Sequence, residues 1–431
     1  MDRFVRHFHV YRADVSLQAR QYMQGLIQAG DRKNLERMQE MIPDSDYQSL
    51  QQFISDSPWD AQDVMDEAAI RASELIGDPQ DACLIIDETS NTKKGHKSVG
   101  VARQYLGCVG KVDNGQVGVF TALCKGSQVA LLHGQVYLPK EWILDKRRCR
   151  EAKVPLDEQV FRTKDEMALD QVRRARALGV KFGWVLADAG YGKGPDFLLN
   201  LHEMGERFLV DVHKDFVVYK SDPRPHVPRR TSSRGRTPTR AKVTAVAYEV
   251  REVVAMLPAS AWKTKTLRPS TKGLVTYPCT RRRVWIWDAQ RKKVLQCHLI
   301  ARRDPVTGEI KYSLSNASQN CTLLKLAKAQ AQRYWIERSF QDCKASCGMK
   351  DYQIRGWIGW HHHMALVILS LLFMLEQRLE NRAEHPNLTC KDIEYLLAKM
   401  LPRKDLTVED ALKLVIERNR RRDALYAANS G

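Results

Sequence analysis

Residues 82–87 read Ala-Cys-Leu-Ile-Ile-Asp, a short apolar run that ends in a carboxylate. The pattern returns at residues 182–188, which read Phe-Gly-Trp-Val-Leu-Ala-Asp. Short continuous apolar runs predict buried strands, so Asp87 and Asp188 are each expected at the end of one. A mixed sheet can bring two such ends together although they lie far apart in the sequence. The two stretches therefore predict an α/β core with an acidic site at one edge of the sheet.

A third acid, Glu337, lies in a helical stretch with Arg333 one turn before it and Lys344 two turns after it. Taken alone, Glu337 and Arg333 would be interpreted as a surface ion pair at the i, i+4 spacing. Magnesium prefers oxygen ligands, and two or three carboxylates carry enough charge for two ions. Asp87, Asp188 and Glu337 are therefore candidate metal ligands and catalytic residues.

Structural interpretations exist for the first two acids as well. Asp87 could cap a turn, and Glu88 competes with it as a ligand. Asp188 could merely start the glycine-rich turn at residues 189–194, Ala-Gly-Tyr-Gly-Lys-Gly. Glycines let a backbone approach a phosphate closely. The segment is not a Walker A loop, because no Ser or Thr follows its Gly-Lys pair.

Positive charge is concentrated in one segment. The net charge of the chain is +18. Residues 220–303 hold 21 Lys or Arg against four acids, which gives +17, and the other 347 residues together carry +1. A one-signed block of this kind indicates a polyanionic partner such as nucleic acid. A membrane surface is a weaker interpretation, because no amphipathic helix accompanies the charge.

The order of the patterns predicts five segments. Residues 1–78 are expected to form a helical N-terminal domain that binds DNA, with a packing role alone as the alternative. Residues 79–214 are expected to form the first part of a catalytic α/β core. A basic, mostly β insertion follows at 215–318, with a mobile loop at 232–236 and a strand over 241–256. The core resumes over 319–384, where helices are expected at 323–347 and 357–379. A helical, basic tail occupies 385–431.

Several residue types exclude other classes of protein. The ten cysteines are scattered and are expected to be reduced, since no zinc-finger spacing occurs. The run His361-His362-His363 is expected to be structural or DNA-facing, because consecutive helical side chains diverge by about 100°. The apolar run at 364–375 is too short to cross a bilayer. Residues 1–16 lack the apolar core of a signal peptide, so a soluble, intracellular protein is expected.

One segment carries a family resemblance. The pattern Gln330-x-x-Arg333-x-x-x-Glu337-x6-Lys344 resembles the Tyr-Arg-Glu-Lys signature of DDE-type insertion-sequence transposases. Gln330 stands where that signature has Tyr. The resemblance to this signature implies that Glu337 is the third catalytic acid. Without the resemblance, Glu337 would be interpreted as part of a surface ion pair.

Four other segments resemble the same family in the same order. Residues 87–90 resemble the motif of the first acid, and residues 187–192 that of the second. Residues 55–60 and 359–363 resemble one branch, the group named after insertion sequence seven-hundred-one. Together the matches cover most of the chain, from about residue 35 to residue 375.

The resemblance implies a ribonuclease-H-like fold with a β insertion between the second and third acids. It implies that Asp87, Asp188 and Glu337 hold two Mg²⁺ ions, with Mn²⁺ as a substitute. It implies metal-dependent DNA cleavage at the ends of a mobile element, followed by strand transfer into target DNA. Arg333 and Lys344 would contact phosphates near the cut.

Further DNA contacts are expected outside the signature. Lys93 and Lys94 follow the first acid closely and are phosphate candidates, with a solvated loop as the alternative. The run Arg281-Arg282-Arg283 belongs to the basic block. Trp285 and Trp287 share one face of a strand and are candidates for stacking on an extruded base, with ordinary β packing as the alternative.

The expected partners are double-stranded DNA, as terminal inverted repeats and as target, and a second copy of the chain in the DNA complex. A bacterial cytoplasmic, nucleoid-associated location without membrane contact is expected. Two alternatives remain open: a ribonuclease-H-like nuclease without strand transfer, and a transposase-derived protein that only binds DNA.

Overall fold

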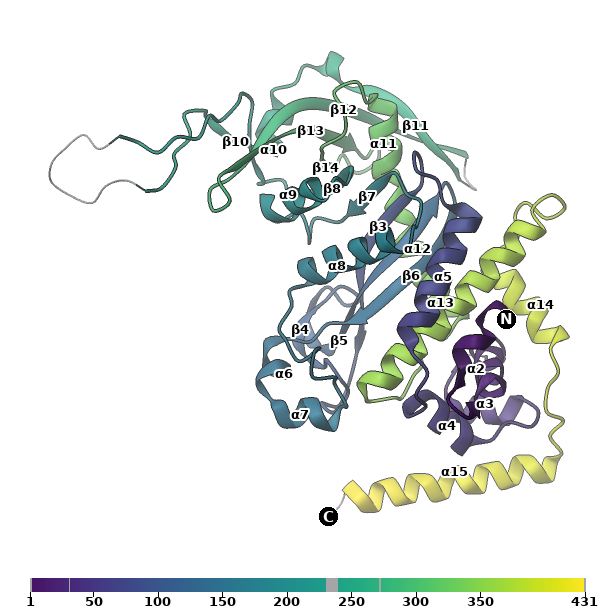
Figure 1. Cartoon of the computed structure of the whole chain (residues 1–431). Coiled ribbons are helices and arrows are strands. Elements are labelled where there is room, and N and C mark those ends of the chain that lie inside the picture. Colours follow the sequence, from purple (N-terminus) through teal and green to yellow (C-terminus); the bar gives the residue numbers. More distant parts are fainter. Residues whose placement is uncertain (1, 31, 230–238, 271–272, 430–431) are drawn as a thin grey trace. The chain divides into compact units, whose positions relative to one another are not determined.

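The computed structural model describes residues 2–30, 32–229, 239–270 and 273–429 (Figure 1). The chain forms two compact units. One unit contains Met1–Val64, Ala152–Val154 and Asp342–Gly431, and the other contains Met65–Glu151 and Pro155–Gln341. The loop expected at residues 232–236 lies outside the described residues.

A mixed sheet is the centre of the second unit. Strand β3 (Cys83–Thr92) runs parallel to β7 (Trp184–Ala187), and β7 runs parallel to β8 (Phe208–Val212). Strand β5 (Lys111–Lys125) pairs with β3 in the antiparallel sense. β5 also pairs with β4 (Ala102–Leu106) and β6 (Gln128–Val136). The fold is α/β with a mixed sheet of the ribonuclease-H-like class, as expected from the sequence.

Helices connect and cover the core strands. α8 (Lys164–Ala177) packs on β5 and begins with a capping box between Thr163 and Glu166, in which two backbone donors of the helix start are satisfied reciprocally. α9 (Pro195–Glu203) follows β7 and has proline in its first turn, where the missing N–H costs nothing. The remaining helices of this part are α5 (Ala61–Ile76), α6 (Lys140–Leu144) and α7 (Lys146–Glu151).

The inserted segment extends the core sheet. Strand β14 (Ile310–Ser315) pairs with β8, and β13 (Lys293–Arg303) and β12 (Gly273–Asp288) follow in order. Strands β9 (Val217–Tyr219), β10 (Ala247–Glu249) and β11 (Lys263–Ser270) complete it, with a short 3₁₀ turn at Ala259–Ala261. In Figure 1, β12 and β13 form the long curved hairpin in green. The strands of the basic block thus belong to the same sheet as the core strands β3, β7 and β8.

The strand predicted over residues 241–256 is wrong for most of its length. Only β10 is extended, and α10 (Val250–Ala255) follows directly. Glu249 and Glu252 form a capping box there, and Val250, Val253 and Val254 are buried at the i, i+3, i+4 spacing of a helix. The apolar valines favoured a strand by composition, but their spacing is helical.

The helix predicted over residues 323–347 is divided at Arg333. α11 (Leu323–Gln332) begins at the cap residue Thr322, and α12 (Tyr334–Ser346) carries Glu337 in its first turn. Gly348 follows with a φ of +67°, the left-handed conformation expected of a glycine that ends a helix.

The first unit consists mainly of helices. They are α1 (Asp2–Val5), α2 (Ser16–Gln28), α3 (Leu35–Met41), α4 (Tyr47–Ser55), α13 (Trp357–Glu380), α14 (Cys390–Met400) and α15 (Val408–Asn429). A 3₁₀ turn (Arg6–Phe8) and two strands of two residues, β1 (His9–Val10) and β2 (Ala13–Asp14), were not expected. They form a small hairpin before α2.

The three consecutive histidines pack in this unit. The His362 ring stacks on the Trp59 ring with 3.7 Å between centroids, and its ring nitrogens lie 3.0 and 2.8 Å from backbone carbonyl oxygens of Ile54 and Trp59. His363 Nδ1 lies 2.8 Å from the Tyr22 hydroxyl. These two histidines join helices of the first unit, so the structural interpretation is confirmed for them.

Helix α13 is longer than its apolar run indicated. By length and composition alone it could cross a membrane, although the run at residues 364–375 had seemed too short. Most of its side chains are buried inside the structure. Burial of this kind is typical of a core helix, so the helix is weak support for a membrane span.

Candidate active site

Strand pairing places Asp87 and Asp188 side by side. Ile86 pairs with Ala187 across the parallel strands β3 and β7. Asp87 is the next residue of β3, and Asp188 directly follows the end of β7. Adjacent strands lie about 4.8 Å apart, so the two carboxylates start from neighbouring positions. The prediction that Asp87 ends its strand is wrong, because β3 continues to Thr92 through pairing with β5.

In the part of the chain that the structure describes, the acids of the site outnumber the single arginine, Arg333, that pairs with them. Asp87 is only 8% exposed, and burial together with the charge of Asp188 raises its pKa to about 7. Glu337 contributes in the same direction, and Arg333 opposes the shift. One oxygen of each aspartate already accepts a backbone N–H, from Glu88 for Asp87 and from Gly190 for Asp188, both at 2.8 Å.

Arg333 joins the acids that lie on different elements. Its Nη1 lies 3.6 Å from Asp87 Oδ2, and its Nη2 lies 3.0 Å from Glu337 Oε1. The Glu337 side chain is half exposed, whereas the Arg333 side chain is 17% exposed. The i, i+4 pair seen in the sequence therefore exists, and the same guanidinium reaches the sheet edge as well.

Asp211 is a fourth carboxylate at this site that sequence reasoning missed. It lies on β8 and is buried, and Arg333 Nε donates to its Oδ2 at 3.1 Å. Burial raises the pKa of Asp211, and Arg333 and a hydrogen bond from Ser313 oppose the shift. The available signal was an acid inside the apolar strand Phe-Leu-Val-Asp-Val at residues 208–212, since a charge in a buried strand needs a partner.

The loop after Asp188 packs against β8. A side chain at Gly192 would meet the Asp211 carbonyl oxygen at 2.0 Å, so only glycine lets the loop pass there. Tyr191 is buried in the same loop, and burial and four nearby carboxylates raise the pKa of its phenol. The glycine-rich turn thus holds Asp188 close to the backbone of the strand that carries Asp211.

The donor chemistry of the acids fits a divalent cation. Carboxylate oxygens are the hard ligands that Mg²⁺ and Mn²⁺ take, and burial, together with the charge of Asp188, raises the pKa of Asp87. Among the described residues, no group of three His, Cys, Asp or Glu side chains converges as a ready metal site. Arg333 lies among Asp87, Asp211 and Glu337 and supplies part of the missing positive charge.

A cavity of about 190 Å³ lies beside Glu337. Its wall includes the Arg268 guanidinium, which packs over the Tyr334 ring at 4.4 Å, and the Arg302 guanidinium, which packs over the Tyr277 ring at 4.8 Å. The other lining residues are Asp211, Leu267, Val275, Lys311, Gln330, Ala331, Arg333 and Glu337. Cations and aromatic rings from the insertion thus meet α11 and α12 at this cavity.

The structure does not bring Lys93 and Lys94 to the acids. They follow the end of β3, six and seven residues beyond Asp87, which corresponds to about 20 Å or more along an extended strand. Burial lowers the pKa of Lys93 to about 8. Lys344 lies two turns after Glu337 on α12.

The arginine run and the tryptophans lie on β12. Arg281 donates to the Cys321 carbonyl, and Arg283 donates to Gln296 Oε1 at 2.5 Å. Trp285 and Trp287 are partly buried on the strand face opposite to buried Val284 and Ile286. The shared face expected for the two tryptophans is confirmed, and their role in binding DNA stays a prediction.

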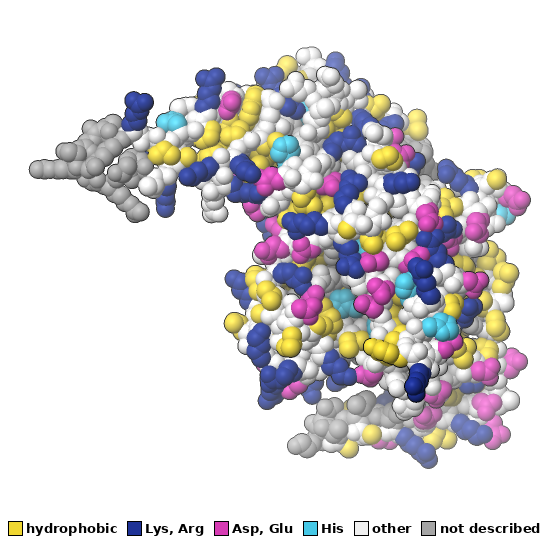
Figure 2. Space-filling model, in the orientation of Figure 1, with side chains coloured by type: hydrophobic (Ala, Val, Ile, Leu, Met, Phe, Trp, Pro, Cys, Tyr) yellow, Lys and Arg dark blue, Asp and Glu magenta, His cyan; other side chains and the backbone are white. Residues whose placement is uncertain are grey.

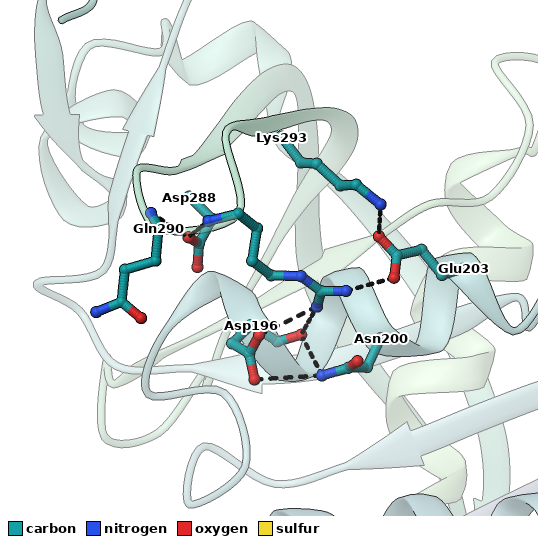
Figure 3. A network of polar contacts seen from close by, with 7 residues as sticks. Asp196, Asn200, Glu203, Asp288, Gln290 and Lys293 are labelled. Carbon is teal, nitrogen blue, oxygen red and sulfur yellow. Dashed lines mark hydrogen bonds and ion pairs between the residues drawn. The ribbon is translucent and has the colours of Figure 1, made fainter. Parts of the chain in front are cut away.

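The turn of the β12–β13 hairpin is tied to α9. Arg291 donates to Asp196 Oδ1 at 3.0 Å and also pairs with Glu203, to which Lys293 pairs as well. Figure 3 shows this network, with Asp288 closing the turn. The basic hairpin is thereby joined to the helix that follows the Asp188 loop.

Exposed cations also lie along an extended arm that includes residues 220–229 and 239–242. Figure 2 shows Lys and Arg side chains along both edges of this arm on the visible face. The exposed ones are Lys220, Arg224, Arg229, Arg240 and Lys242.

Comparison with known proteins identifies the family. A family model described as DDE superfamily endonuclease matches residues 3–274. The chain belongs to this family. The match includes Asp87 and Asp188, and it ends before Glu337.

A curated relative agrees with the family. The chain is 32% identical over 233 residues to the "Probable transposase for insertion sequence element IS701" of Microchaete diplosiphon. The alignment covers 53% of this chain and 57% of the relative, so it spans little more than half of the relative's length. The resemblance to DDE-type transposases drawn from the sequence is confirmed.

The raised pKa of Asp87 predicts a pH-dependent stability effect in the absence of divalent metal. Its folded value of about 7 lies above the unfolded value of 3.8, so the folded chain binds the proton more tightly. The free energy of unfolding therefore falls as pH rises from about 4 to about 7. Asp87→Asn is expected to melt several degrees higher than wild type at about pH 8 in EDTA. The difference should vanish near pH 4, and a pH-independent difference would contradict the assignment.

Proposed function

We propose that this chain is a DNA transposase that cuts element ends and joins them to target DNA, with divalent metal held by Asp87, Asp188 and Glu337. The carrying observation is that Asp87 and Asp188 directly follow Ile86 and Ala187, which are paired across the parallel strands β3 and β7. The raised pKa of Asp87 and the family membership support the proposal. The printed name of the curated relative supports transposition in particular.

The residues of the site divide into two roles. Asp87, Asp188 and Glu337 would hold Mg²⁺, which stabilises the attacking and leaving oxygens of an in-line phosphoryl transfer when two ions are bound. Arg333 can release its contacts to Asp87 and Glu337 and donate to a phosphate, because a guanidinium binds phosphate as well as carboxylate. Lys344, on the same helix, is a second phosphate candidate.

DNA is proposed to lie along the basic insertion. Trp285 and Trp287, on the solvent-accessible face of β12, are candidates for stacking on a base near the cut end. Two chains would hold the two element ends, so a dimer in the DNA complex is proposed.

Strand transfer separates this proposal from its nearest alternative. Purified protein is incubated with Mg²⁺, labelled DNA carrying the flanking ends of the element, and a supercoiled target plasmid. A transposase gives a product in which a labelled 3′ end is joined to the plasmid. Cleavage without any joined product would favour the nuclease, and metal-independent binding without cleavage would favour a protein that only binds DNA.

Salt dependence tests the arginine run on β12. Each released phosphate contact contributes about 0.9 to the slope of log K against log salt. Replacing Arg281, Arg282 and Arg283 by Ala is therefore expected to reduce the slope by up to about 2.7. Arg147→Ala removes an exposed arginine on α7, outside the basic block, and should leave the slope unchanged. An unchanged slope in the triple variant would exclude the run from the DNA interface.

A further inference from the structure

The two oxygens of Asp211 are both engaged inside the protein. Ser313 Oγ donates to Oδ1 at 2.5 Å, and Arg333 Nε donates to Oδ2 at 3.1 Å. Gln330 Nε2 in turn donates to Ser313 Oγ at 2.6 Å. Asp211 and Ser313 are direct cross-strand partners of β8 and β14. The carboxylate is therefore held in one orientation by the sheet itself.

This fixed carboxylate sets the orientation of the Arg333 guanidinium. A guanidinium is a planar fork, so a contact at Nε determines where its two other nitrogens point. In this chain they point at Asp87, 3.6 Å away, and at Glu337, 3.0 Å away. Three carboxylates from three elements thus share one positive charge.

We propose that Asp211 is a positioning residue. It keeps the Arg333 guanidinium between Asp87 and Glu337, and it holds the guanidinium nearby when a divalent cation displaces it from these two acids. This inference rests on the proposed metal site. A cation bound by Asp87 and Glu337 must displace the two Arg333 contacts. Because the guanidinium keeps its Asp211 contact, the displacement leaves it with a partner in a buried place, where an unpaired charge is costly.

Removal of Asp211 changes that balance. Without this third carboxylate, Arg333 would neutralise Asp87 and Glu337 alone, and it could leave them only by losing both of its remaining ion pairs. Divalent metal would then compete against a more tightly held guanidinium. The apparent affinity for the metal is expected to fall, although Asp211 itself need not touch the metal.

The test is a calorimetric titration of the full-length protein with Mn²⁺ alone, in the absence of DNA. Asp211→Asn preserves side-chain size and is expected to raise the Kd for Mn²⁺ about tenfold, within the usual range of pairwise couplings. Arg333→Ala removes the competitor and is expected to lower the Kd. In the Arg333→Ala background, Asp211→Asn should have no further effect, because its role acts through the guanidinium. Asp211→Glu keeps the charge and should bind Mn²⁺ within about threefold of wild type.

Each alternative outcome has a distinct meaning. An equal shift by Asp211→Asn in both backgrounds would overturn the positioning role, and so would unchanged Mn²⁺ binding in Arg333→Ala. The Arg333→Ala result decides the matter even where Asp211→Asn does not fold. A wild-type chain that binds no Mn²⁺ would overturn the metal site of the proposed function, and this inference with it. Asp113→Asn, which removes an acid paired with Lys111 on β5, is the matched control and should leave the Kd unchanged.

Discussion

Asp87→Asn and Asp188→Asn are each expected to reduce DNA cleavage at least about a thousandfold, since stabilisation of transition-state charge by metal is worth several kcal/mol. The two residues directly follow Ile86 and Ala187, which are paired across adjacent parallel strands, so loss of either removes an oxygen ligand from the same place. Asparagine keeps the size and one oxygen of each side chain. Cleavage of labelled element-end DNA under single-turnover conditions measures the effect.

DNA binding distinguishes loss of chemistry from loss of fold. Both variants should bind element-end DNA as well as wild type in EDTA, because the basic block at residues 220–303 is unchanged. Asp113→Asn, another acid on a strand of the same sheet, should cleave at the wild-type rate. Wild-type cleavage by either site variant would remove that residue from the catalytic set.

Lys33→Met is expected to destabilise the first unit by about 3 kcal/mol, the usual range for breaking a buried ion pair. The Lys33 side chain is 1% exposed. Its Nζ donates to the Ile27 carbonyl at 3.1 Å, to the Ser346 carbonyl at 3.0 Å and to Glu394 Oε1 at 3.0 Å. The substitution leaves a carboxylate and two carbonyl oxygens without this donor. Denaturant unfolding followed by circular dichroism measures the loss.

A second lysine offers a matched control for this prediction. Lys391 Nζ also lies 3.0 Å from Glu394, but its side chain is 74% exposed. An exposed ion pair contributes at most about 1 kcal/mol, so Lys391→Met should change stability little. Equal losses for the two variants would show that burial of Lys33 does not determine its contribution.

The sequence made Asp87 and Asp188 recognisable because their signal is local. Each follows an apolar run, and such a run predicts a buried strand without reference to distant residues. Glu337 could be recognised as a candidate catalytic acid only from its spacing to Arg333 and Lys344. The prediction that the strand ends at Asp87 was wrong. Residues 88–92 are mostly polar, and their extended conformation comes from pairing with β5.

Asp211 shows what local patterns cannot provide. Its environment depends on the pairing of β8 with β14, 102 residues away at Ser313, and on Arg333, 122 residues away. No window of the sequence contains both partners. The same limit applies to the insertion, whose strands were expected from composition but whose continuity with the core sheet depends on long-range pairing.

A change of metal specificity tests most directly whether residue 87 touches the metal. Asp87→Cys replaces a carboxylate by a thiolate, a ligand that Mg²⁺ binds poorly and that softer divalent ions accept more readily. Cleavage by this variant is expected to be lost in Mg²⁺ and partly restored in Mn²⁺, while wild type cleaves in both. Cleavage by Asp87→Cys in Mg²⁺ at the wild-type rate would contradict the proposed role of Asp87.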